Sequence, residues 1–278
     1  MTGSARLDTY DRIGDSLAGR YFRHKLFPLT TSELNKATKE NPSFLLTKLL
    51  NRGGFPEPYL AENDIDRKRW RLQYIQSLLT IDALDIDNIQ NIKAFRLVFE
   101  LLRHRVASPV SYQSIAEDVQ ISPHTVKKYI QILEALYVVF RVTPYAKNIS
   151  RSLLKEPKIY FYDTGLVEGD EERLENEVAL SLLKDCNFSQ DVKGTAHFLH
   201  YLRTKDGKEV DFLVADNEKP QLIIEVKQTE STISRPLRYF HEKHGFQAIQ
   251  VVQHLRNEYT KDGVQVLKLD TFLAQLNI

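Results

Sequence analysis

Hydrophobic and polar positions divide the chain into three segments. In the middle of the chain, apolar residues recur every three or four positions, which predicts a segment made almost entirely of helices. From Pro157 onward the repeat shortens to two, which predicts short strands separated by charged turns. The first segment is rich in Arg, Gly and Pro and ends in the turn cluster Gly53–Pro58, where regular structure must stop. We therefore expect three domains, 1–60, 61–150 and 151–278.

The composition is that of an ordinary globular protein. The 278 residues are 42% hydrophobic and 27% charged, and this length accommodates two or three modules of ~150 residues. The 38 Lys and Arg residues exceed the 37 Asp and Glu residues by one, so any nucleic-acid-binding surface must be local. Cys186 is the single cysteine, which excludes an intrachain disulfide framework and a CxxC zinc site. With no signal segment and no apolar run of ~18 residues, we expect a cytoplasmic protein that makes no contact with a membrane.

The C-terminal segment predicts a definite order of elements. A helix is followed by a hairpin of two strands around the turn Lys205–Lys208, then by a third strand, a second helix and a fourth strand. This is an α-β-β-β-α-β arrangement, so the expected fold class is multi-domain α/β with a helical middle. The expected elements are the helix 171–184, the strands 197–203, 209–215 and 221–228, the helix 235–243 and the strand 247–252.

Alternation along two of these strands brings charged side chains to one face. In the second strand, Val210 and Phe212 are expected on one face and Asp211 on the other. In the third strand, Glu225 and Lys227 share the face opposite to the apolar residues. If the two strands are neighbours, Asp211, Glu225 and Lys227 converge. Two carboxylates and an ammonium in a buried position are costly unless the carboxylates bind a cation or pair with the lysine.

The helix before the strands adds a third carboxylate. The residues three, four and seven positions beyond Glu175 are apolar, so Glu175 is expected on the face that packs against the sheet, whereas Glu177 is not. Oxygen ligands without cysteine or clustered histidine favour Mg²⁺ or Mn²⁺ over zinc, with Asp211 and Glu225 as metal ligands. Such an ion would polarise a phosphoryl oxygen and activate a bound water, which Lys227 would orient. The expected catalytic residues are Glu175, Asp211, Glu225 and Lys227.

The helix–Asp–ExK arrangement resembles the core of the PD-(D/E)xK nuclease superfamily. Asp211 matches the metal-binding aspartate, Glu225–Lys227 the ExK triplet and Glu175 the helical glutamate, while Val210 stands where the motif usually has proline. The resemblance implies a restriction-endonuclease-like fold and a metal-dependent phosphodiesterase. The alternative is that Lys227 forms salt bridges with two carboxylates on an exposed face of the sheet and the site is inert.

The helical middle contains a helix-turn-helix pattern. A short helix over 111–119 is followed by Ser122, a good N-cap, and by Pro123 at the first position of a second helix. The stretch Tyr137–Val142 would form the strand of a wing. The alternative is a winged-helix packing module whose basic face is only solvated. For DNA binding, the second helix presents a face typical of a recognition helix, formed by His124, Lys127, Lys128 and Gln131.

The first segment closely resembles the latter part of an AAA-type ATPase module. The family is a prokaryotic group of ATPases with a C-terminal winged-helix and nuclease-like region. The resemblance implies nucleotide-related roles for Ser4, near a sensor position, and for Arg20, at an arginine-finger position. The stretches that carry the resemblance are Thr2–Arg6, Gly14–Phe22, Leu26–Leu29, Gly53–Pro58, Tyr160–Leu166 and Leu174–Asn176.

The chain contains no GxxxxGK[ST] loop and no acidic Walker-B strand. Because the backbone of that loop is what binds the phosphates, we expect no ATP binding by this chain alone, and a partner chain would have to supply the loop. The chain is then either a fragment or a shortened gene product without the ATPase half. Two hypotheses remain: a Mg²⁺-dependent nuclease-like, DNA-associated protein, or a catalytically inert regulatory module that binds DNA or a partner protein.

Overall fold

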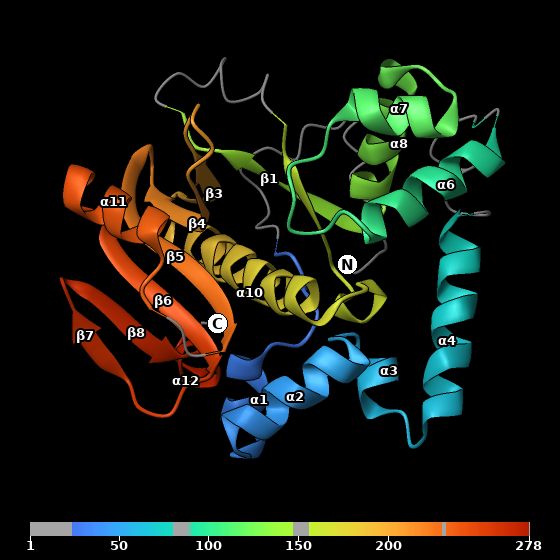
Figure 1. The fold of residues 1–278 in the computed structure, drawn as a ribbon. Coiled ribbons are helices and arrows are strands. Elements are labelled where there is room, and N and C mark those ends of the chain that lie inside the picture. The colour runs from blue at the N-terminus through green and yellow to red at the C-terminus, as the bar shows by residue number, and fades with distance from the viewer. Residues whose placement is uncertain (1–23, 80–88, 90, 147–155, 230–231, 278) are drawn as a thin grey trace.

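The structure is a computed structural model that describes residues 24–79, 89, 91–146, 156–229 and 232–277. It is a mixed α/β fold in which helices surround one eight-stranded sheet (Figure 1). Among the described residues, no helix combines the length and the apolar composition needed to cross a membrane. Ser4 and Arg20, with the nucleotide-related roles expected for them, lie outside the described residues.

The helical character expected for the middle of the chain is confirmed. Polar N-cap residues begin most of these helices: Ser111 accepts a hydrogen bond from the backbone of Ser114, and Ser122 accepts one from Thr125. Pro123 occupies the first turn of its helix, as expected. The helices of the middle segment are α4 (Asp64–Ser77), α6 (Ile92–Arg103), α7 (Tyr112–Val119) and α8 (Pro123–Ala135), and the first segment also contains helices, α1 (Thr31–Thr38), α2 (Pro42–Arg52) and α3 (Pro56–Leu60).

The turn cluster Gly53–Pro58 ends α2 where the sequence predicts a stop, but α3 begins within the cluster, because Pro56 is suited to the first position of a helix. Gly53 follows the last residue of α2 and has a φ of +75°, a conformation that residues with a side chain rarely adopt. A side chain at Gly53 would also collide with the carboxylate of Asp163. Arg71 of α4 bonds the same carboxylate, with its Nε 2.9 Å from Asp163 Oδ2. Gly53 therefore lets the first helices approach the C-terminal part of the chain closely.

In the part of the chain that the structure describes, eight strands form a single sheet with parallel and antiparallel pairs, in the order β2-β1-β3-β4-β5-β6-β8-β7. The α-β-β-β-α-β order expected from the sequence is present as α10, β3, β4, β5, α11 and β6. The strands are β1 (Val139–Pro144), β2 (Lys158–Phe161), β3 (His197–Arg203), β4 (Glu209–Asp216), β5 (Lys219–Thr229), β6 (Gln247–His254), β7 (Tyr259–Lys261) and β8 (Val264–Lys268). The remaining helices are the 3-10 turn η3 (Thr164–Leu166), α10 (Asp170–Lys193), α11 (Arg235–His244) and α12 (Leu269–Ala274).

The strand expected as a wing belongs to the main sheet. β1 pairs antiparallel with β2 and, through Thr143 and Pro144, parallel with β3. One hydrophobic core also joins the helical middle to the sheet: the rings of Phe99 in α6 and Phe161 in β2 meet edge to face, with centroids 5.8 Å apart. The sheet and this core thus continue across residue 150, where the sequence analysis divides the chain.

The helices α10 and α11 cover opposite faces of the sheet. The core on the α10 face contains Val178 of that helix together with Phe212 of β4. The core on the α11 face contains Leu237 of that helix together with Leu213 of β4. Side chains that point to the two faces of β4 are therefore buried under different helices.

An irregularity in β4 overturns one expectation about its faces. Leu202 of β3 pairs with Val210 and His200 pairs with Leu213, so β4 has an extra residue over this stretch. This register shift is the signature of a β-bulge. Val210 lies in the core on the α11 face and Phe212 in the core on the α10 face. The prediction that Val210 and Phe212 share a face is wrong, because strict alternation holds only where the ladder is regular.

Candidate active site between α10 and the sheet

Asp211 lies at the bulge, where β4 and β5 separate. The ladder between the two strands ends at the pair Phe212 and Ile224, and Asp211 is the next residue beyond it. Asp211 Oδ2 accepts a hydrogen bond from the backbone N–H of Val226 at 2.9 Å, in place of a backbone partner. The side chain keeps 16% of its surface exposed. Its carboxylate is therefore anchored by the sheet and still open to solvent.

Glu225 and Lys227 form an ion pair on the adjacent strand. Lys227 Nζ lies 2.8 Å from Glu225 Oε1. Glu225 Oε2 is buried and has no hydrogen-bond partner among the described residues. Burial and then the charge of Asp211 raise the pKa of Glu225 to about 7, although Lys227 lowers it. Burial lowers the pKa of Lys227, but Glu225, Asp211 and Glu175 together raise it above its usual value.

Glu175 reaches the same region from α10. Its Oε1 accepts hydrogen bonds from Lys158 Nζ at 3.1 Å and from the Tyr160 hydroxyl at 2.6 Å. Burial and then repulsion by Asp211 raise the pKa of Glu175, while Lys158 and Tyr160 lower it. Glu175 therefore faces the sheet, as expected, and its hydrogen-bond partners are Lys158 and Tyr160 of β2.

Glu209 is one residue of this site that is not expected from the sequence, and Lys158, which contacts it, is another. Its Nζ lies 2.9 Å from Glu209 Oε1, 3.1 Å from Glu175 Oε1 and 3.7 Å from Asp211 Oδ1, and its side chain is 1% exposed. Burial lowers the pKa of Lys158, but the three carboxylates raise it well above its usual value. One feature of the sequence could have indicated this role. Lys158 lies within the short apolar strand β2, two residues before Tyr160 and therefore on the same face as that tyrosine.

A second glutamate of α10 corrects another expectation. Glu177 is fully buried, and its Oε2 accepts a hydrogen bond from the Thr164 hydroxyl at 2.8 Å. Burial raises the pKa of Glu177 to about 7. The prediction that Glu177 lies off the packed face is wrong, because η3 and the α2 helix also cover α10 and leave little of its surface free.

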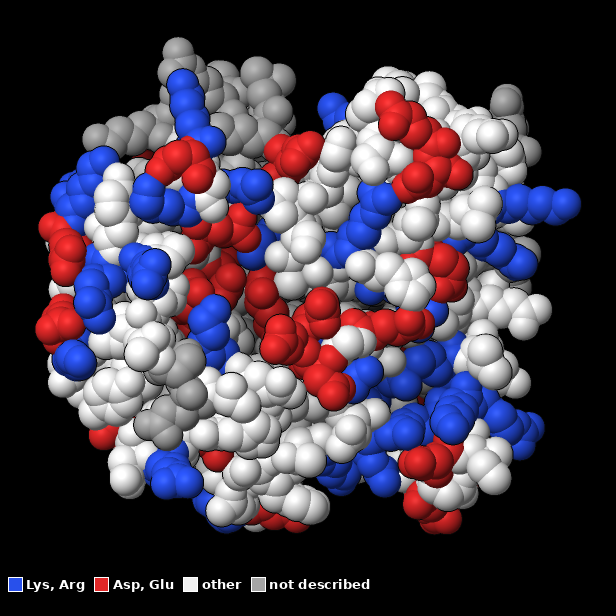
Figure 2. Space-filling model, viewed as in Figure 1, with Lys and Arg blue, Asp and Glu red and all other residues white. Residues whose placement is uncertain are grey.

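The four carboxylates Glu175, Glu209, Asp211 and Glu225 are called here the acidic cluster. Figure 2 shows acidic side chains in a band across the middle of one face, over α10, with Lys and Arg side chains gathered over α11. The cluster is joined to two ammonium groups, those of Lys158 and Lys227. Of the four catalytic residues expected from the sequence, Asp211 and Lys227 are each within electrostatic reach of the other three.

The acidic cluster fits a divalent cation in its chemistry. Carboxylate oxygens are the ligands that Mg²⁺ and Mn²⁺ prefer, and Glu225 Oε2 is a buried oxygen without a partner among the described residues. The pKa of Glu225 is raised by burial and then by the charge of Asp211, and a cation bound at these carboxylates would offset both effects. Within the described residues, no three Asp, Glu, His or Cys side chains are arranged as they stand to hold an ion. Asp211 and Glu225 are the residues that would hold one.

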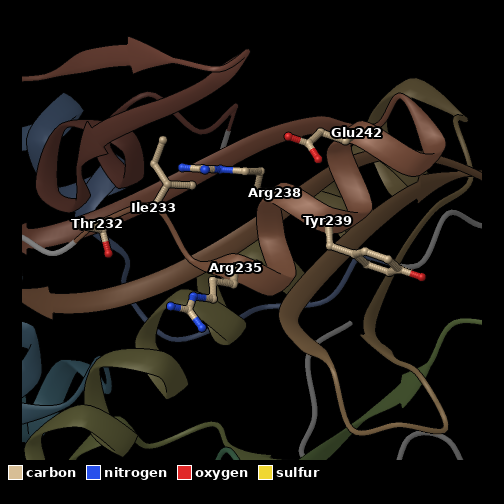
Figure 3. A pocket seen from close by; sticks show the side chains of 6 residues that line it. All are labelled: Thr232, Ile233, Arg235, Arg238, Tyr239 and Glu242. Atoms are coloured by element: carbon tan, nitrogen blue, oxygen red, sulfur yellow. The ribbon is translucent and has the colours of Figure 1, made fainter.

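A pocket of about 370 Å³ lies at α11. The segment just before the helix lines it and continues into Ser234, whose hydrogen bond lowers the pKa of Glu225. The segment that leads into α11 therefore lines the pocket and also contacts Glu225 of the acidic cluster. Figure 3 shows the side chains that line the pocket: Thr232, Ile233, Arg235, Arg238, Tyr239 and Glu242.

The helix α8 has the two faces expected from its sequence. Val126, Ile130 and Leu133 are fully buried. On the other face, His124, Lys127 and Gln131 are exposed and Lys128 is half-buried. The amphipathic pattern is confirmed, and contact of this face with DNA stays a prediction.

Two family models match parts of the chain. Residues 43–169 match a domain of unknown function, DUF8612, and residues 172–272 match another, DUF4143. The second match contains the whole acidic cluster, and the first contains Lys158. No solved structure matches the chain.

The chain is also similar to proteins of bacteria and of an archaeon. It is 28% identical to the uncharacterized protein Rv2008c of Mycobacterium tuberculosis, over 86% of this chain and 54% of that protein. An uncharacterized protein of Haemophilus influenzae is 24% identical, over 99% of this chain and 70% of that protein. The uncharacterized protein MJ1544 of Methanocaldococcus jannaschii is 24% identical, over 86% of this chain and 58% of that protein. The chain spans about half the length of the mycobacterial relatives it matches.

Proposed function

We propose that this protein is a Mg²⁺- or Mn²⁺-dependent phosphodiesterase that acts on nucleic acid, with its active site at the acidic cluster. The observation that carries the proposal is the position of Asp211. It lies where the β4–β5 ladder ends, beside the Glu225–Lys227 ion pair and within electrostatic reach of Glu175. The order α10, β3, β4, β5, α11, β6 supports a restriction-endonuclease-like PD-(D/E)xK core.

Each residue of the site has a chemical role in this proposal. Asp211 and Glu225 would hold the divalent ion, which supplies positive charge to a phosphoryl oxygen and lowers the pKa of a water. Lys227, with 39% of its side chain exposed, would orient the attacking water or stabilise charge in the transition state. Glu175 would exchange a proton near neutral pH, because burial and Asp211 raise its pKa.

The surroundings of the acidic cluster support a phosphate-bearing substrate. Arg235 and Arg238 line the pocket at α11, and guanidinium groups are suited to phosphate oxygens, although Arg238 also pairs with Asp262. We further propose DNA association through α8, with His124, Lys127, Lys128 and Gln131 at the DNA in the manner of a winged helix.

The relation to AAA-type ATPases with a C-terminal winged-helix and nuclease-like region is part of the same proposal. The DUF4143 match over residues 172–272 is consistent with it. ATP binding by this chain would need a P-loop from a partner chain. A cytoplasmic location stays a prediction.

A cleavage assay with a matched lysine control tests the proposal. Wild type, Lys227→Ala and Lys219→Ala are incubated with end-labelled DNA and RNA, single- and double-stranded, in Mn²⁺, Mg²⁺ or chelator. Lys219 lies at the exposed start of the same strand, so its loss should not matter. We expect metal-dependent cleavage by wild type and Lys219→Ala, and a loss of about 100-fold or more in Lys227→Ala. No cleavage by wild type, or equal cleavage by Lys227→Ala, contradicts the proposal.

The buried Lys158 favours a second candidate function. An ammonium already paired with Glu175, Glu209 and Asp211 neutralises part of the cluster without any metal. If Lys158 takes the place of a metal ion in this way, the site is catalytically inert, and the protein is a regulatory module that binds DNA or a partner protein. Binding of labelled DNA by wild type without cleavage in any metal would favour this function over the first.

A further inference from the structure

Lys158 is a buried cation that comes from a strand not paired with β4 or β5. Its side chain is 1% exposed, and its Nζ lies within 4 Å of carboxylate oxygens from three residues. A buried ammonium is costly and is tolerated only where charged partners surround it. Two of those partners, Glu175 and Asp211, are residues of the proposed active site. The role of Lys158 therefore bears directly on that site.

The surroundings of Lys158 Nζ have the composition of a cation site. Glu175 approaches from α10, Glu209 and Asp211 approach from β4, and the ring of Tyr201 lies 5.5 Å away. Carboxylates from separate elements are the ligand type that hard divalent ions take. The distances of 2.9, 3.1 and 3.7 Å are those of an ammonium rather than of a metal.

Charge balance limits how many further cations the acidic cluster can take. Arg203 Nη1 also lies 2.9 Å from Glu209 Oε2, so with Lys158, Lys227 and Arg203 the four carboxylates leave a formal charge of −1. A single divalent ion already exceeds this charge, and a second one would leave a large excess of positive charge. The buried oxygen without a hydrogen-bond partner among the described residues, Glu225 Oε2, belongs to β5, whereas the carboxylates that Lys158 contacts belong to α10 and β4.

We propose that the ammonium of Lys158 occupies a second cation position of this centre, where it positions Glu175 and Asp211 and restricts the centre to one divalent ion. Lys158 is thus a positioning residue. The restriction to one ion rests on the proposed function. The occupation of a cation position by Lys158 can be tested whether or not the protein cleaves nucleic acid.

Replacing the charge of Lys158 tests the proposal. Lys158→Met keeps the length of the side chain and leaves Glu175, Glu209 and Asp211 around a vacant position. In chelator we expect its Tm to fall by about 10 °C, and millimolar Mn²⁺ to restore most of the loss. Calorimetric titration should give one more bound Mn²⁺ per chain than in wild type.

Lys184→Met is the matched control. Lys184 is also a buried lysine, paired with Glu33 and bonded to the carbonyl of Pro28 at 3.0 Å, but it has a single carboxylate partner within bonding distance. Its loss should lower the Tm without restoration by Mn²⁺. If Lys158→Met does not fold, Lys158→Met/Glu209→Gln removes one of the repelling acids and should still gain one ion.

The outcomes separate this inference from the proposed function. Equal behaviour of Lys158→Met and Lys184→Met in Mn²⁺, or no gained ion in either Lys158 variant, overturns the inference and leaves the proposed function standing. A wild type that neither binds Mn²⁺ nor cleaves overturns the proposed function. A gained ion in Lys158→Met would even then support the place of Lys158 at a cation position.

Discussion

The carboxylate of Asp211 accepts a hydrogen bond from the backbone N–H of Val226 at 2.9 Å, at the point where β4 and β5 stop pairing. The Asp211 side chain thus gives the Val226 N–H an acceptor at a position where the β4–β5 ladder offers no backbone carbonyl. This hydrogen bond holds Asp211 beside Glu225 at the end of the ladder, whereas Oδ1 of Asp211 lies 3.7 Å from Lys158. The acid is therefore fixed by the geometry of the strands and not by an ideal ion pair.

Asp211→Asn should separate metal binding from stability. The amide oxygen can still accept from Val226, so in chelator the melting temperature should remain close to that of wild type. The stabilisation that millimolar Mn²⁺ gives to wild type should be lost, because one metal ligand is gone. Thermal melts in chelator and in Mn²⁺ measure both effects. A loss of on the order of 3 kcal/mol that is the same with and without metal would instead make Asp211 a structural partner of Lys158.

Glu177 should make stability fall as pH rises. The pKa of Glu177 is about 7 in the folded protein, against a usual value of 4.5, because burial disfavours its charge. The folded state therefore binds the proton more tightly, and the stability this contributes is complete below pH 4.5 and lost as pH rises through 7. Relative to Glu177→Gln, wild type should lose roughly 3 kcal/mol across this range.

Urea unfolding at several pH values measures this difference. Glu171→Gln, a change at an exposed position in the first turn of the same helix, is the control and should follow wild type. Parallel pH profiles of wild type and Glu177→Gln would rule out Glu177 as the source of the pH dependence.

The buried ion pair between Arg71 and Asp163 should contribute strongly to stability. Asp163 is 1% exposed and Arg71 16%, and Asp163 Oδ1 also accepts a hydrogen bond from the backbone of Gly165 at 2.9 Å. Asp163→Asn leaves the guanidinium without its charge partner and should cost about 3–5 kcal/mol in denaturant unfolding. Asp262→Asn breaks a half-exposed pair with Arg238 and should cost less than about 1 kcal/mol. Similar losses for both variants would contradict this difference in burial.

DNA binding, if carried by α8, should weaken with its lysines. Each phosphate contact contributes about 0.9 to the slope of log K against log salt on duplex DNA. Lys127→Ala/Lys128→Ala should therefore flatten that slope by up to ~2 in fluorescence titrations at several salt concentrations. The pair Lys36→Ala/Lys48→Ala, on α1 and α2, is the control and should leave it unchanged. An unchanged slope in the α8 variant would place the contacts elsewhere.

Local features were predictable from the sequence because they depend on neighbouring residues. Ser122 and Pro123 begin α8 where capping predicts, and the change in hydrophobic period anticipates the order of helices and strands in the C-terminal segment. The spacing of charges also identified Asp211 and the Glu225–Lys227 ion pair as residues that come together. Each of these inferences needs only the geometry of one helix or of two adjacent strands.

Tertiary structure decided what covers those elements. Lys158 lies in the acidic cluster because β2 packs near α10 and β4, a contact between distant parts of the chain. Glu177 is buried because several elements surround α10, so a single inward stripe underestimates what is covered. The β-bulge places Val210 and Phe212 on opposite faces of the sheet. The alternation of apolar and polar residues in β4 does not predict the extra residue of this bulge. The sequence by itself determined the order of elements from α10 to β6 and the approach of Asp211 to Glu225 and Lys227, because these depend on neighbouring residues and strands, whereas long-range packing determined that Lys158 of β2 joins the acids.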